Sequence, residues 1–337
     1  MTRGPGSVMR FVRILVLALF FAGVFAAPRA ARAETGAVPR FVVSEATAEA
    51  RVGRIRLRYD PALAEEARFL LEHAPGFWSV VERQLEGDLD DTLTIHLVDH
   101  AGAVASATGM PRWVAGVARP ETGEIVVARH GPDGSRSDLA GLLRHEMAHV
   151  ALYRAVDGHR VPRWLHEGVA ESLEGKVSLA RAETLAGAVF GPGVPELADL
   201  ERAFSSDDPT EVSVAYAAAR DFVAHLRGLD GSGAAFRQFL YELSEGYTVD
   251  AAAVRAFGRT LPELVRSWRT ALPDRFVWYA LAAGGGLPFA ALLPLVAAAW
   301  WRRRRLLREA FARLEAEDRR VFGESAMAPS YVACAGS

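Results

Sequence analysis

The residues best suited to chemistry lie in two short motifs within residues 139–174. The first is HEMAH at residues 145–149, an H-E-x-x-H pattern. The second is WLHEG at residues 164–168, and Glu171 follows it closely. Together these motifs predict a zinc site with three protein ligands and its own general base.

The spacing of the first motif fits metal binding. Residues four apart lie on one face of an α-helix, so His145 and His149 can bind the same ion. Glu146 points elsewhere around the helix and can instead reach a water at the metal. Catalytic zinc keeps an open position for water and lowers the pKa of that water to about 7. We therefore predict Glu146 as the general base that removes its proton.

The second motif supplies the third ligand. Pro162 suits the first turn of a new helix. Glu167 and Glu171 are four apart on that helix, so they share a face, and burying two carboxylates is costly unless a cation compensates. We predict Glu167 as the third zinc ligand. We expect Glu171 to hydrogen-bond the imidazole of His145 and fix its tautomer.

Two histidines are rival third ligands. His159 lies ten residues after His149 and fits no ligand pattern. His166 neighbours Glu167 but points elsewhere around the helix. Glu167 remains the prediction.

Both motifs resemble those of the gluzincin metallopeptidases, most closely the bacterial peptidase MA-like domain, over about residues 54–272. In gluzincins the H-E-x-x-H is followed by a ligand Glu on the next helix, often within W-L-x-E-G. The gap from His149 to Glu167 is one residue shorter here than in the aminopeptidase branch, which a shorter loop would absorb. The resemblance implies an α+β gluzincin-like metallopeptidase domain with a small mixed sheet, the HExxH helix and a mostly helical C-terminal half. It also implies Zn²⁺ as cofactor and a protein or peptide as substrate.

Two further features rest on this resemblance. In gluzincins a strand beside the site binds the substrate backbone by edge addition, and Ala115–Ala118 is the candidate. A tyrosine on a later helix can donate a hydrogen bond to the oxyanion, and Tyr216 is the candidate. An ordinary core tyrosine in an amphipathic helix fits Tyr216 equally well.

Apolar periodicity predicts the elements around the motifs. Asp138 can cap the helix that carries HEMAH, and Gly158 can end it. His96, His100 and His130 are isolated and are expected to have no role in the site. We expect strands at 54–59 and 93–98, a helix at 61–85, a hairpin from 113–118 and 124–128, and helices throughout 176–272.

Composition excludes several classes of protein. The net charge of −2 over 337 residues gives no indication of nucleic-acid binding. The single cysteine, Cys334, rules out an intramolecular disulfide and any site built from several cysteines.

The N-terminus has the pattern of a secretory signal over residues 1–33. Three arginines precede the apolar run 14–27, and Ala-Arg-Ala closes it at 31–33. The alternative is an uncleaved anchor, although the run is short for a membrane span. The metallopeptidase domain would then occupy residues 34–275.

A second apolar run, residues 276–301, carries no charge and is long enough to cross a bilayer. Aromatic residues stand at both of its ends, and Arg302–Arg305 follow at once, which predicts a cytoplasmic tail at 302–337. We therefore expect a single-pass protein of the bacterial cytoplasmic membrane with its catalytic domain periplasmic or extracellular.

Two alternatives to a peptidase stay open from the sequence. One is a membrane-anchored zinc-binding assembly factor without proteolysis, which would need a fourth protein ligand. The other is a zinc-dependent amidase that acts on cell-wall substrates.

Overall fold

The computed structural model describes residues 40–44, 46–85, 92–174, 179–283, 294–305 and 308, with side chains left out at 179–180 and 278–283. The chain divides into two units, Met1–Phe276 and Val277–Ser337. Both chemical motifs lie in the first unit.

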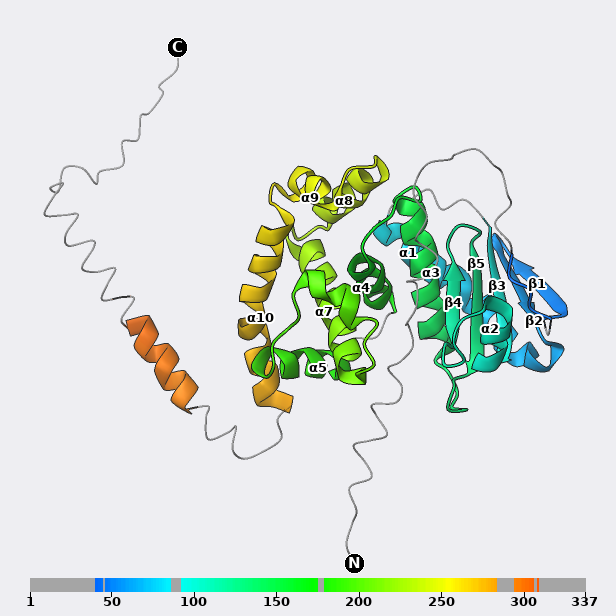
Figure 1. Ribbon diagram of the computed structural model, residues 1–337, viewed down its shortest axis with the longest axis horizontal. Coiled ribbons are helices and arrows are strands. Elements are labelled where there is room, and N and C mark those ends of the chain that lie inside the picture. The colour runs from blue at the N-terminus through cyan, green and yellow to red at the C-terminus, as the bar shows by residue number, and fades with distance from the viewer. Residues whose placement is uncertain are drawn as a thin grey trace, which may run out of the picture. The chain divides into compact units, whose positions relative to one another are not determined.

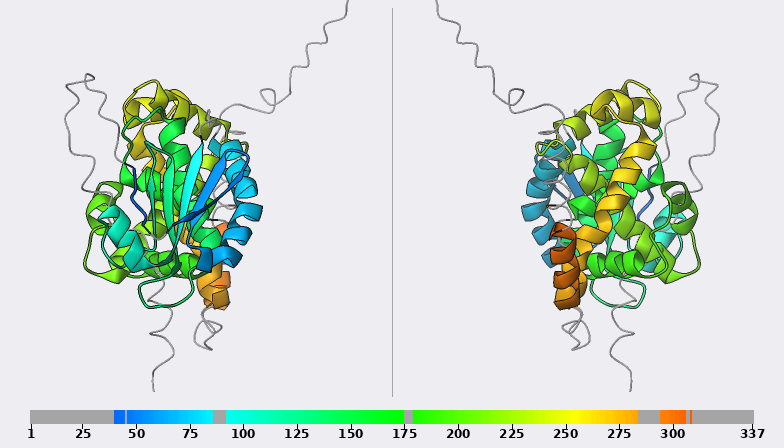
Figure 2. Two further views of the ribbon diagram at one scale, coloured as in Figure 1. Left: turned by 90° about the vertical axis from the view of Figure 1, so that its right-hand side faces the viewer. Right: turned by 90° about the vertical axis from the view of Figure 1, so that its left-hand side faces the viewer.

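A five-stranded mixed sheet forms one part of the first unit (Figure 2). Its order is β1-β2-β3-β5-β4, which puts β4 at an edge. Neighbouring strands pair antiparallel in β1–β2 and β4–β5 and parallel in β2–β3 and β3–β5. This confirms the small mixed sheet. The strands are β1 Ala48–Val52, β2 Ile55–Tyr59, β3 Leu93–His100, β4 Gly116–Arg119 and β5 Glu124–His130.

The two faces of the sheet are covered by different helices. The 3₁₀ turn η3 (Pro61–Leu63) and helix α1 (Ala64–Leu85) connect β2 to β3, and α2 (Ala101–Thr108) follows β3. Val117 of β4 packs in a cluster with Val104 of α2 and Phe41. The adjacent Gly116 instead faces helix α3 (Leu139–Ala155), as alternation along a strand requires.

Helix α3 (Leu139–Ala155) carries the HEMAH motif and contacts β4 and β5. The side chain of Asp138 accepts a hydrogen bond from the Gly141 N–H at 3.3 Å, so the predicted N-cap is confirmed. The helix ends at Ala155, slightly before the expected Gly158. Gly158 adopts a φ of 67° there, and its N–H donates to the Tyr153 carbonyl at 2.8 Å.

The remainder of the first unit is helical, as predicted (Figure 1). Pro162 is the N-cap of α4 and lies just outside the helix that it was expected to begin. The elements are α4 Arg163–Leu173, α5 Leu179–Phe190, η4 Leu197–Asp199, α6 Leu200–Ala203, α7 Pro209–Gly228, α8 Ala234–Ser244, α9 Val249–Phe257 and α10 Leu261–Ala283, of which α10 continues past Phe276 into the second unit.

Aromatic contacts fix α4 against α7 and α10. The rings of Trp164 and Phe222 lie 5.1 Å apart, and those of Phe222 and Trp268 lie 5.2 Å apart. The Trp268 indole N–H donates to Asp221 at 2.7 Å. This buried column holds the helix that carries WLHEG in one orientation.

Residues 294–305 of the second unit are helical. Among the residues that the structure describes, no helix is both long enough and apolar enough to span a membrane. The middle of the expected span, 284–293, lies outside the described residues, as do the expected signal at 1–33 and Cys334.

Candidate metal centre

Three predicted ligands converge between α3 and α4. Glu167 Oε2 lies 3.8 Å from His145 Nε2 and 4.0 Å from His149 Nε2. The two imidazole rings are 4.8 Å apart and nearly perpendicular. All three side chains are buried, with exposures of 7%, 5% and 3% for His145, His149 and Glu167.

The polar atoms of this cluster suit a metal ion. Within the described part of the chain, His145 Nε2 and Glu167 Oε2 are buried without a hydrogen-bond partner, and such orphaned atoms are costly. Zinc binds histidine nitrogen and carboxylate oxygen at about 2.0–2.2 Å. Ligand atoms 3.8–4.0 Å apart are no farther from each other than twice that bond length, so one ion can reach Glu167 and each histidine. The residues present fit zinc.

Burial sets the protonation of the histidines. Desolvation lowers the pKa of His145 to about 4, with the Glu174 carboxylate opposing the shift. Desolvation also lowers the pKa of His149 well below its usual value. Both rings are thus neutral at physiological pH, which is the form that binds a metal.

Glu146 lies beside the cluster on α3, and only 4% of it is exposed. Burial, reinforced by the nearby Glu167 carboxylate, raises its pKa to about 8. A hydrogen bond from the backbone of Ala118 in β4 opposes the shift. Glu146 therefore stands between the three ligands and the edge strand of the sheet.

The edge strand comes unusually close to Glu146. A Cβ on Gly116 would lie 2.9 Å from Glu146 Oε1 and 2.6 Å from Leu142 Cδ1. Only glycine leaves that space open. The predicted substrate strand, Ala115–Ala118, thus overlaps β4, which begins at Gly116 and borders the cluster.

Glu171 lies near His145, as predicted, and it also pairs with an arginine that the sequence did not indicate. Carboxylate oxygens of Glu171 and Glu174 lie within 4.8 Å of a His145 nitrogen. Arg181 Nη1 makes a 2.6 Å ion pair with Glu171 Oε2. Burial raises the pKa of Glu171 to about 8, and Arg181 opposes this. The hydrogen bond that the His145 imidazole would donate to Glu171 stays a prediction.

The rival histidines are not part of the ligand cluster. His159 Nδ1 lies 3.0 Å from the Val156 carbonyl, a local contact at the end of α3. The ring of His166 is 5.8 Å from that of His149. Among the described residues, neither belongs to a group of possible ligands that meet within bonding range of one ion.

Tyr216 of α7 is buried beside Glu167. Its hydroxyl makes no hydrogen bond of standard geometry with the described residues, although the Arg163 guanidinium lies close to it. Its ring packs edge-on against Phe204 at 5.1 Å. Burial, reinforced by the Glu167 carboxylate, raises the pKa of the phenol well above its usual value. The hydroxyl therefore keeps its proton and remains able to donate.

Two arginines at the site were missed by the sequence analysis. Arg181 joins Glu171 to Glu174, and Arg163 pairs with Glu167. The second could have been found, because Arg163 precedes Glu167 by four residues on one helix. The first comes from a separate helix, and no local spacing indicates it.

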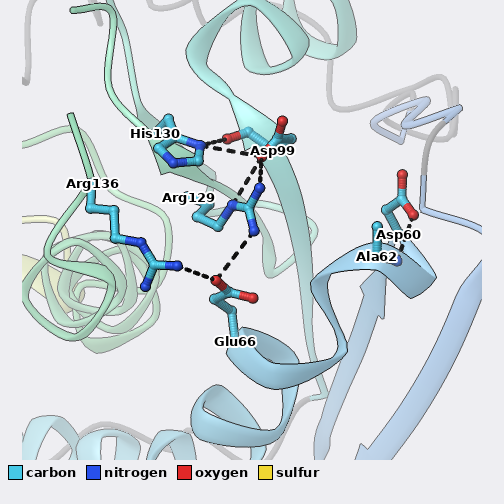
Figure 3. Close-up of polar contacts among 7 residues, drawn as sticks. All are labelled: Asp60, Ala62, Glu66, Asp99, Arg129, His130 and Arg136. Atoms are coloured by element: carbon cyan, nitrogen blue, oxygen red, sulfur yellow. Dashed lines mark hydrogen bonds and ion pairs between the residues drawn. The ribbon is translucent and has the colours of Figure 1, made fainter. Parts of the chain in front are cut away.

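A polar network braces the loop that leads into α3 (Figure 3). Asp99 at the end of β3 accepts hydrogen bonds from Arg129 Nε at 2.9 Å and faces His130 Nδ1 at 3.2 Å. Glu66 of α1 pairs with both Arg129 and Arg136, at 3.4 and 3.3 Å. His130 thus belongs to this network, whereas His145, His149 and Glu167 form the metal cluster.

Comparisons with known proteins give one family match and a distant structural similarity. Among solved structures, the chain is similar to a mutant M1 zinc metallopeptidase from Deinococcus radiodurans, with 19% identity and a TM-score of 0.37. That match covers 66% of this chain and 50% of the other, so the chain spans about half the length of that protein. No curated protein sequence matches the chain. The sequence profile of the Peptidase MA superfamily matches residues 84–274, more than half of the chain. This protein therefore belongs to the Peptidase MA superfamily.

Proposed function

We propose that the protein is a zinc metallopeptidase in which His145, His149 and Glu167 hold the metal and Glu146 is the general base. The observation that carries the proposal is the convergence of three buried ligand atoms within 4.8 Å of one another, next to a buried carboxylate. When bound, zinc supplies a Lewis acid that polarises the scissile carbonyl and lowers the pKa of water at the site.

Glu146 moves the proton in this proposal. It accepts a proton from the attacking water and returns it to the leaving amine. A group that must do both works best when its pKa lies near the working pH. In the metal-free protein, burial and the Glu167 carboxylate raise the pKa of Glu146 to about 8. A bound cation would lower this pKa toward the working pH, which favours the double role.

The substrate backbone is proposed to lie along β4. This strand is at the edge of the sheet, so its outer backbone groups can pair with an extended peptide. The Ala118 backbone and the open space at Gly116 both border Glu146. A peptide added there would place its carbonyl between the base and the metal ligands.

Tyr216 is proposed to stabilise the oxyanion. Its protonated hydroxyl is buried near Arg163 and makes no hydrogen bond of standard geometry with the described residues. A guanidinium can only donate, so the phenol proton stays available. Such a donor is available to a charge that develops in the transition state.

We further propose that the domain, residues 34–275, is exported and tethered by one C-terminal span over 276–301, with 1–33 as signal peptide and 302–337 as cytoplasmic tail. Large apolar side chains in the helix at 294–305 support this, because Leu295, Val296, Trp300 and Trp301 are all exposed. Arg304 lies over the Trp300 ring at 4.9 Å, a contact suited to a membrane interface. The substrate would then be an exported or membrane protein.

The test of the peptidase assignment is Glu146→Gln in the full-length protein, purified in detergent. The substitution keeps shape and all three ligands but cannot accept a proton. Zinc content should stay at the wild-type level, and kcat/KM on a peptide library should fall by about 10²–10⁴-fold. Wild-type turnover by this variant would refute the role of Glu146.

The wild-type protein separates the alternative functions. Zinc binding without peptide hydrolysis in the wild type would favour the assembly factor, and cleavage of cell-wall fragments alone would favour the amidase.

A further inference from the structure

The two oxygens of the Glu167 carboxylate face different groups. Oε2 faces His145 and His149 at 3.8 and 4.0 Å. Oε1 faces Nε of Arg163 at 3.5 Å. Arg163 begins α4, one helical turn before Glu167, so the pair shares a helix face.

Arg163 is held in place from several sides. Its side chain is only 9% exposed, and its guanidinium lies 4.9 Å from the centre of the Phe204 ring. Nη1 donates to Ser205 Oγ at 3.1 Å, and the backbone N–H donates to Glu201 Oε1 at 2.8 Å. The segment around α6 therefore fixes both the main chain and the side chain of this arginine.

This arrangement needs an arginine. The guanidinium fork presents Nε to Glu167 and Nη1 to Ser205 at once, in a plane that also covers Phe204. A lysine has one nitrogen and cannot occupy both positions. The same Phe204 ring contacts Tyr216, so Arg163 and Tyr216 share a neighbour.

We infer that Arg163 is a positioning residue of the metal centre, which engages Glu167 Oε1 and leaves Oε2 as the single oxygen directed at the two histidines. The inference rests on the proposed zinc site. Without Arg163, the carboxylate is free to rotate about its last torsion, and either or both oxygens can turn toward the ion. The partners that orient a zinc ligand typically contribute about 10–100-fold to metal affinity.

The experiment measures metal binding by the full-length protein. Zinc affinity is obtained by competition with a chromophoric chelator, and coordination is followed in the visible spectrum of the cobalt-loaded protein. Arg163→Met should weaken zinc binding by about 10–100-fold and change the cobalt spectrum. Arg163→Lys should recover part of the affinity, because it keeps the charge without the fork. Arg202→Met is the matched control, since Arg202 is 80% exposed on α6 and pairs only with Asp199 among the interactions described for it.

Wild-type affinity and an unchanged cobalt spectrum in Arg163→Met would overturn the inference. If that variant does not fold, as judged by circular dichroism, Arg163→Gln serves in its place with the same expected and contrary results. Glu167→Ala separates this inference from the proposed function. If Glu167→Ala binds zinc normally, the ligand assignment itself fails. If Glu167→Ala loses zinc while Arg163→Met keeps it, only the role of Arg163 fails.

Discussion

Gly168 of α4 lies against Ala219 of α7 so closely that a Cβ on Gly168 would stand 2.5 Å from the Ala219 carbonyl oxygen. It would also stand 2.6 Å from Val223 Cγ2. The neighbour in the chain is Glu167, the proposed third ligand. The glycine of the WLHEG motif thus sets the distance between the ligand helix and the helix that carries Tyr216.

We predict that Gly168→Ala destabilises the protein and weakens zinc binding. Backbone atoms of α7 cannot move aside as a flexible side chain can, so α4 must shift and take Glu167 with it. Overpacking of this kind costs about 1–3 kcal/mol of unfolding free energy. Denaturant unfolding and a zinc titration measure the two effects.

Gly187→Ala is the control for this prediction. Gly187 lies in α5, and a Cβ there would meet nothing within 4 Å. Alanine at such a helical site should stabilise the fold by about 0.4–1 kcal/mol. Equal responses of the two variants would mean that the Gly168 contact has no special importance.

The third ligand can be identified by alanine substitution. Glu167→Ala should lower zinc affinity by more than the roughly 10–100-fold that partners of a ligand contribute. His159→Ala and His166→Ala should leave zinc affinity nearly unchanged, because neither lies in the ligand cluster. Zinc content after dialysis of each variant is the measurement. A normal zinc content in Glu167→Ala would contradict the gluzincin ligand set.

In the metal-free protein, the free energy of unfolding should fall as the pH rises toward 8. Burial raises the pKa values of Glu146, Glu167 and Glu171 from near 4.5 to about 8, 7 and 8. A carboxyl whose pKa is higher in the folded than in the unfolded protein stabilises the fold most below about pH 4.5. This contribution to the free energy of unfolding is lost as the pH rises through the pKa of the folded state. His145 has the opposite effect, because its pKa is lowered to about 4. Between about pH 4 and 6.5 its contribution to the free energy of unfolding increases as the pH rises.

The measurement compares thermal unfolding with zinc and with a chelator at about pH 6.5 and about pH 8.5. A bound cation favours the ionised carboxylates, so the chelator should lower Tm more at the higher pH. Glu146→Gln should narrow this difference, because glutamine does not ionise. A chelator effect that is the same at both values would show that these carboxyls do not govern stability.

The sequence predicted the local elements better than their arrangement. The runs at 54–59 and 93–98 form β2 and β3, as predicted. Alternation of apolar and polar residues is a direct sequence signal of a half-buried strand. Strand β1 was missed, since AEARV carries little apolar signal. Helix α2 was missed too, because its eight residues, four of them alanine, show no apolar periodicity.

The metal cluster was predictable because its information is local. Two histidines lie one turn apart on one helix, and Glu167 follows at the start of the next. The approach of Gly116 to Glu146 was not predictable, because it depends on which strand forms the sheet edge. The pairing of Arg181 with Glu171 likewise depends on how α5 packs. Spacing reveals neighbours on one element, whereas contacts between elements require the fold.

The last prediction concerns topology, which decides what substrates the site can meet. Arginines precede the apolar run at 14–27, and four arginines follow the run at 276–301. Arginine and lysine beside a span stay in the cytoplasm. Both runs therefore predict that residues 34–275 are exported and that the tail from Arg302 is cytoplasmic.

Alkaline phosphatase fusions in a bacterial host test this orientation, because the reporter is active only after export, where its disulfides form. A fusion after Leu272 should be active, and a fusion after Phe322 should be inactive. Replacing Arg302–Arg305 with glutamine should raise the activity of the second fusion, since the positive charge that holds the tail inside is then gone. The same replacement should leave the first fusion unchanged. The reverse pattern would place the metal cluster in the cytoplasm, and the substrate would then be a cytoplasmic protein.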